Sequence, residues 1–206
     1  MSVSLRSFVF LDALQPQLTA HTCSTARGFW PVPDEAALYI EIAPGMAIHT
    51  LLDRALKDTD VHPGNIVVER AYGMVMLHAF DKGQVLAAGD AILSELGHTI
   101  EDRLKPTVAT HEIIRAMEPD HAQCVNKLRW GSMIVPGESL LIMETQPAAY
   151  IALAANEAEK AAQVNLLECS PVGAFGRLYM GGSEAEIDVA AEVAKAAIAA
   201  IDGQPG

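Results

Sequence analysis

The sequence has few aromatic residues, few positive charges and no long apolar run. Of its 206 residues, 5% are aromatic and 19% are charged, whereas 50% are hydrophobic. This apolar content excludes a disordered chain, and the core must be built mainly from Ala, Val, Leu, Ile and Met. The longest apolar run, 148–155, is far shorter than the roughly 20 residues that cross a bilayer. We therefore expect a soluble, cytoplasmic protein.

Basic residues are too scarce for an anionic partner. Lys and Arg number 14 against 26 Asp and Glu, a net charge of −12, and no basic cluster exceeds a pair. Binding to nucleic acid or to an anionic membrane is therefore not expected. The three cysteines, Cys23, Cys124 and Cys169, have no CxxC spacing. This excludes a disulfide framework and a zinc knuckle, and it favours reduced, buried thiols.

The chain repeats itself at an offset of 103 residues. Ala13-Leu-Gln-Pro16 aligns with Ala116-Met-Glu-Pro119, and Ala71-Tyr-Gly73 aligns with Ala174-Phe-Gly176, in one register without a gap. Residues 1–103 and 104–206 each carry 7 basic and 13 acidic groups. A register that persists across several predicted elements indicates gene duplication. We predict two copies of one domain, 1–103 and 104–206.

Each copy has the same expected order of strands and helices. Opening strands are predicted at 7–14 and 110–117, each ended by a turn at Pro16 or Pro119 and followed by a stretch punctuated by Gly and Pro. Strands that a proline closes come next, then a helix, two strands joined by a Gly-bearing turn, and a last helix. The predicted class is α+β (loosely α/β), with an antiparallel sheet and helices on one face in each copy. The later strands are expected at 37–42, 65–69, 74–79, 139–145, 165–169 and 177–181, and the helices at 45–58, 81–96, 148–162 and 184–201.

These segments resemble the shell domain of bacterial microcompartments. The matching pattern is Ile-Glu-Ile-Ala-Pro-Gly-Met-Ala-Ile at 40–48, a helix ending at Lys57, and Val-Val-Glu-Arg-Ala-Tyr-Gly at 67–73. Met-Glu-Thr-Gln-Pro-Ala-Ala-Tyr-Ile at 143–151 and Val-Gly-Ala-Phe-Gly at 172–176 repeat it in the second copy. About 35 residues precede the pattern in both copies, which is similar to the circularly permuted tandem subclass.

The resemblance implies a structural shell protein rather than an enzyme. It implies a homotrimer whose six domains mimic a hexagonal tile, which some members of the subclass stack into a dimer of trimers. It also implies hexameric and pentameric shell proteins as partners in a microcompartment shell. It also implies a central pore that can open or close and that passes small metabolites. The expected pore and gate residues are Glu69, Arg70, Ala71, Tyr72, Gly73, Gly173, Ala174, Phe175 and Gly176.

Glu69 and Arg70 are the strongest candidates for the gate. An adjacent Glu-Arg pair is usually a solvated surface pair that contributes little. Here the aligned residues in the other copy are Val172 and Gly173, so only one of two matched loops carries charge. Around a threefold axis, three Glu and three Arg could pair and close a pore, because Arg binds carboxylates bidentately. The resemblance assigns the gating role to this pair.

Lys57 and Lys160 occupy the same position near the end of the first long helix of each copy. A cation there can simply favour the helix dipole; the resemblance implies instead a contact at the tile edge. Neither a metal nor a cofactor is expected, because the seven histidines show no ligand spacing and no phosphate-binding or nucleophile motif occurs.

Two other readings remain open from the sequence. The chain could be an enzyme with an unrecognised site between its copies, or a trimeric small-molecule sensor or carrier built from duplicated α+β domains. Turnover would identify an enzyme. A sensor would stay a discrete trimer, whereas a shell protein would form sheets or enter shells.

Overall fold

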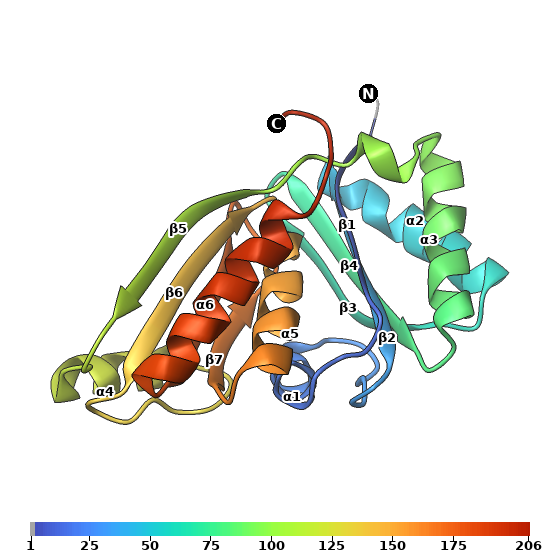
Figure 1. The fold of residues 1–206 in the computed structure, drawn as a ribbon. Helices are drawn as coiled ribbons and strands as arrows, with labels where there is room; N and C mark the ends of the chain where they lie inside the picture. Colours follow the sequence, from blue (N-terminus) through green and yellow to red (C-terminus); the bar gives the residue numbers. More distant parts are fainter. Residues whose placement is uncertain (1–2) are drawn as a thin grey trace.

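The computed structural model describes residues 3–206 and contains two four-stranded antiparallel sheets (Figure 1). The first has the strand order β1-β2-β4-β3. Its copy also contains three α-helices, of which α2 continues a short 3-10 turn (η1) that begins after Pro44. The elements are β1 (Ser4–Leu11), α1 (Pro16–Thr25), β2 (Ala36–Ala43), η1 (Gly45–Ala47), α2 (Ile48–Asp58), β3 (His62–Glu69), β4 (Tyr72–Ala79), α3 (Lys82–Leu96) and the 3-10 helix η2 (Ile100–Asp102).

The second sheet has the equivalent order β5-β6-β8-β7. The first strands of the two copies, Ser4–Leu11 and Thr107–Ile114, begin 103 residues apart, as the sequence alignment requires. The α+β class and the antiparallel sheets are thus confirmed. The elements are β5 (Thr107–Ile114), α4 (Pro119–Leu128), β6 (Ser139–Gln146), the 3-10 helix η3 (Ala148–Tyr150), α5 (Ile151–Ala161), β7 (Asn165–Ser170), β8 (Gly176–Gly182) and α6 (Glu184–Ala199).

Two details of the expected secondary structure are wrong. The opening strands end at Leu11 and Ile114, three residues before their predicted ends. The turns predicted at Pro16 and Pro119 are instead the first residues of the helices α1 and α4. Proline suits the first turn of a helix, where its missing N–H would be unpaired. The α1 sequence, PQLTAHTCST, has many weak helix formers, which hid the helix from sequence reading.

The two long helices of each copy cover one face of its sheet, as expected. Leu141 and Met143 of β6 pack with α5 and α6 in one apolar cluster. Side chains alternate along a strand, so Leu140 points to the other face, where it packs with Ala122 and Val125 of α4. The short helices therefore lie on the faces that the long helices leave free.

The two copies share one core across a seam. Helix α1 lies against α5 and β7 of the second copy (Figure 1). The carboxylate of Glu159 on α5 accepts hydrogen bonds from the backbone N–H groups of Gln17 (2.7 Å) and Leu18 (3.0 Å) in the first turn of α1. Burial raises the pKa of Glu159, while these two donors oppose the rise. The second copy thus supplies the helix cap that Gln15 does not.

The cysteines differ in exposure. Cys169 is buried and burial raises the pKa of its thiol, whereas Cys124 is exposed and Cys23 is half-buried. The expectation of buried thiols is therefore correct for one of the three. Among residues 3–206, no helix combines the length and the apolar content of a membrane span.

Candidate functional site

The charged pair lies at the tip of the β3–β4 hairpin. Glu69 pairs with Tyr72 in the strand register, which leaves Arg70 and Ala71 as a two-residue turn. Glu69, Arg70 and Ala71 are all exposed. The backbone of Arg70 has φ +54°, a left-handed conformation that costs a non-glycine residue about 1–2 kcal/mol. The turn thus holds an arginine where glycine would be unstrained.

The matched loop of the second copy lies beside this hairpin tip. Gly173, which aligns with Arg70, has φ +99° and uses the freedom that Arg70 lacks. A Cβ atom at Gly173 would lie 3.3 and 3.4 Å from the two carboxylate oxygens of Glu69. The structure therefore brings Glu69 against the second loop, whose Ala174 and Phe175 are exposed.

The base of the hairpin is fixed by close backbone contact. A Cβ atom at Gly73 would lie 2.2 Å from the carbonyl oxygen of Gly45, so no larger residue fits there. In the second copy, a Cβ atom at Gly176 would likewise lie 2.1 Å from the carbonyl oxygen of Ala148. These contacts explain why both loops end in glycine, because β4 and β8 each start against the 3-10 turn that precedes the long helix of their copy.

A buried ion pair that the sequence analysis missed lies beside the hairpin. Nε of Arg6 donates to Oε1 of Glu41 at 2.6 Å, and the Arg6 guanidinium carbon lies 3.7 Å from the ring centroid of Tyr72. Burial raises the pKa of Glu41 and the Arg6 cation opposes the rise. Oε2 of Glu41 accepts from the backbone N–H of Ala149, which belongs to the second copy. The repeat could have pointed to Arg6, because its aligned residue is Ala109.

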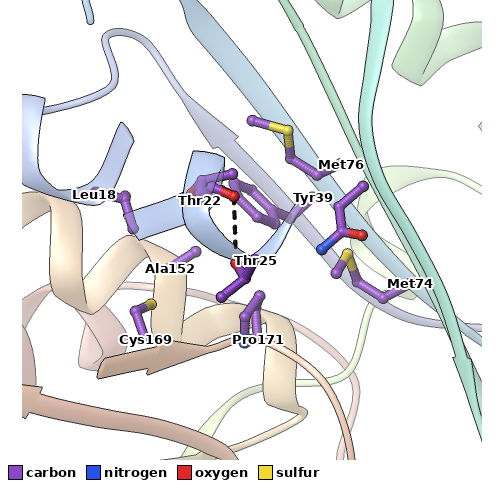
Figure 2. Close-up of a pocket in the computed structure, with 10 residues that line it drawn as sticks. Leu18, Thr22, Thr25, Tyr39, Met74, Met76, Ala152, Cys169 and Pro171 are labelled. Carbon is purple, nitrogen blue, oxygen red and sulfur yellow. Dashed lines mark hydrogen bonds between the residues drawn. The ribbon is translucent and has the colours of Figure 1, made fainter. Parts of the chain in front are cut away.

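A small cavity lies in the seam between the copies (Figure 2). It encloses about 20 Å³, which is room for about one water molecule. Asn65 contributes a buried side-chain oxygen that has no hydrogen-bond partner among residues 3–206. A water there would satisfy this oxygen, but a metabolite would not fit. The residues lining the cavity are Leu18, Thr22, Thr25, Tyr39, Asn65, Met74, Met76, Ala152, Cys169 and Pro171.

The two aligned lysines have different surroundings. The Lys57 side chain is 69% exposed and pairs with Asp53 on its own helix at 2.5 Å. The Lys160 side chain is 30% exposed and pairs with Asp12 across the seam at 3.0 Å and with Glu157 at 2.8 Å. The hydrogen bond from Lys160 lowers the pKa of Asp12. Their roles at a tile edge stay predictions.

The hairpin tip of the first copy is an exposed, charged loop. Within the part of the chain that the structure describes, no three His, Cys, Asp or Glu side chains are grouped so as to hold a metal ion. The hairpin tip has instead two exposed opposite charges, a strained backbone and a firmly seated base.

Comparison with known proteins identifies the family. The CsoS1D N-terminal domain family matches residues 5–102. The chain is 51% identical over 197 residues to the carboxysome shell protein CsoS1D of Hydrogenovibrio crunogenus, covering 95% of this chain and 96% of that protein. The chain belongs to the tandem-domain shell proteins of bacterial microcompartments.

Solved structures agree with this assignment along the whole chain. The fused permuted hexameric shell protein of the RMM microcompartment has a TM-score of 0.95 at 41% identity, with 98% of this chain and 99% of that chain covered. The double-ringed trimeric shell protein of the same microcompartment also has a TM-score of 0.95, at 39% identity, covering 99% and 100%. The tandem, permuted architecture expected from the sequence is confirmed, and the protein is a structural component of a microcompartment shell.

Proposed function

We propose that the protein forms a trimeric, six-domain tile with a central pore, and that Glu69 and Arg70 gate the passage of small metabolites through it. The observation that carries the proposal is the strained, charged hairpin tip of the first copy lying against the glycine loop of the second. The tile would work with other hexameric and pentameric shell proteins. It would have no catalytic role.

The seam within one chain supports the trimer. Inside the chain, α1 packs on α5 and β7. The equivalent elements 103 residues away are α4 on one side and α2 with β3 on the other, and both carry exposed apolar side chains, for example Leu128 on α4 (69% exposed) and Leu56 on α2 (39% exposed). Joining α4 of one chain to α2 of the next, three times, repeats the same seam and closes a ring of six domains.

One contact of the intrachain seam has an equivalent that the proposed trimer would form between chains. Ala149 is buried in the intrachain seam and its N–H binds Glu41. The aligned residues are Met46, which is 68% exposed in the single chain, and Glu144. In the proposed trimer, Met46 of one chain would meet Glu144 of its neighbour. Met46→Glu should therefore dissociate the trimer in native mass spectrometry, whereas Leu86→Glu, on the exposed face of α3, should not.

The loop geometry supports a pore with two states. Three charged loops would alternate with three small ones around the threefold axis. Like charges near the axis repel unless each Arg70 pairs with a Glu69, so a paired ring would close the pore. The left-handed backbone of Arg70 raises the free energy of the loop conformation seen in this structure, and a second conformation can relieve that strain.

The gate is tested by charge removal and charge exchange. Glu69→Ala and Arg70→Ala should each change the pore cross-section seen by cryo-electron microscopy and the permeability of shells to phosphorylated metabolites. The exchanged pair, Glu69→Arg with Arg70→Glu, keeps complementary charges and should recover part of the closed population. The proposal fails if both single variants leave the cross-section and the permeability as they are in the parent.

The relatives favour a carboxysome as the compartment, since a protein 51% identical over 95% of this chain is a carboxysome shell protein. The double-ringed relative favours face-to-face stacking of two trimers. Native mass of the purified protein would separate three chains from six. Electron microscopy would then distinguish a tile, which assembles into sheets or shells, from a discrete trimeric carrier.

A further inference from the structure

The first copy contains a buried cation next to its pore loop that the second copy lacks. In the strand pairing of β1 with β2, the register passes from Leu5 opposite Ile42 to Ser7 opposite Glu41. Arg6 is therefore the extra residue of a β-bulge, and bulges commonly redirect a side chain. The second copy has the same bulge between Val108 and Thr110, and its extra residue is Ala109. The fold repeats the bulge, but only the first copy uses it to insert a charge.

The Arg6 side chain has two partners, which lie on the neighbouring strands β2 and β4 of the first sheet. Its Nε binds Glu41, which is 1% exposed and which also binds the backbone of the second copy at Ala149. Its guanidinium stacks on Tyr72, the first residue after the Arg70-Ala71 turn. Its Nη2 is buried and has no hydrogen-bond partner among residues 3–206. The cation thus depends on the Tyr72 ring for its second contact.

We propose that Arg6 is a positioning residue for the pore loop. It holds Tyr72 at the seam between the copies and thereby sets how often the Glu69–Arg70 turn leaves its position beside Gly173. The role of this clamp in the pore rests on the proposed gating function, whereas the contact between Arg6 and Tyr72 is seen in the structure. A buried ion pair is weak evidence for stability but can fix one conformation among several. Here the pair links the charged loop of one copy to the backbone of the other.

The aligned residue Phe175 provides a natural control for Tyr72. A phenylalanine is therefore compatible with this turn, and Tyr72→Phe keeps the ring face that a cation needs. Tyr72→Leu removes the ring. Removing Arg6 alone would leave the buried Glu41 carboxylate without a counter-charge. Arg6→Met is therefore combined with Glu41→Gln, whose amide oxygen can still accept from the backbone N–H of Ala149.

The test is amide hydrogen exchange of residues 69–73 in the assembled protein, with α6 as the internal reference. Tyr72→Leu and the Arg6→Met/Glu41→Gln double variant should each speed exchange of the loop by about 2- to 30-fold. This is the change in the opening equilibrium that corresponds to the free energy of one cation–π contact. Tyr72→Phe should stay within about twofold of the parent, and α6 should be unaffected in every variant.

Three results would overturn the clamp. Both ring and ion-pair variants could exchange like the parent. Tyr72→Phe could exchange as fast as Tyr72→Leu, so that the ring face would not matter. The ion-pair variant could be unchanged while Tyr72→Leu is fast, so that Arg6 would not be the anchor. These rates do not depend on what crosses the pore, so a failure of gating would appear separately, as unchanged permeability in Glu69→Ala and Arg70→Ala.

Discussion

Gly173→Ala is the most informative substitution in the loop region. Its left-handed backbone, φ +99°, costs alanine about 1–2 kcal/mol. The new Cβ would also lie 3.3 Å from a carboxylate oxygen of Glu69, so this side chain must move by a few tenths of an ångström or rotate away. We expect a loss of stability of about 1–2 kcal/mol together with a displaced Glu69.

Gly137→Ala is the matched control, because the two effects separate there. Gly137 has φ +91°, but a Cβ at this position has open space around it. Both variants should lose similar stability in chemical denaturation, whereas only Gly173→Ala should move Glu69 in a crystal structure and change the cross-section of the proposed pore. The reasoning is refuted if Glu69 keeps its parental position in Gly173→Ala, or if both variants displace it equally.

Three further predictions concern the turn, the seam and its pH dependence. Arg70→Gly should relieve the left-handed strain and stabilise the present turn by up to about 1–2 kcal/mol, seen as slower hydrogen exchange of residues 69–73; equal or faster exchange would contradict the strain. Glu159→Ala should cost about 1–2 kcal/mol in denaturation because α1 loses its cap, whereas the exposed Glu192→Ala should be neutral. Asp12→Asn should cost less than about 1 kcal/mol at neutral pH. Because the pKa of Asp12 is lowered below its ordinary 3.8, its contribution is present above that pH and is lost as the pH falls below it, so parent and variant should converge in acid. A difference that persists unchanged at pH 2 would exclude the Asp12–Lys160 pair as its cause.

The internal repeat predicted most of the fold because duplicated segments must form equivalent elements. The prolines that close β2 and β6, the long helices after them and the glycine that ends each loop all recur at one offset. The alignment also isolated Glu69 and Arg70, since the matched loop has Val172 and Gly173. The division of the chain near residue 103 stays a prediction from that repeat.

The sequence predicted turns where the helices α1 and α4 begin. In α1 the residues are weak helix formers, so local propensity opposes the helix. In α1 the cap comes from Glu159, more than 130 residues away in the chain, so no local pattern announces it. The unequal surroundings of Lys57 and Lys160 have the same origin, because Asp12 reaches Lys160 only through the seam.

The sequence by itself therefore determined the duplication, the α+β class and the charged loop, because each is a pattern along the chain. Only the tertiary structure decided which groups meet. It brought Glu69 against Gly173, gave Arg70 a left-handed backbone, and stacked Arg6 on Tyr72. The first depends on how the two copies pack and the others on the strand register and turn geometry of the first sheet, and no local pattern along the chain shows these arrangements.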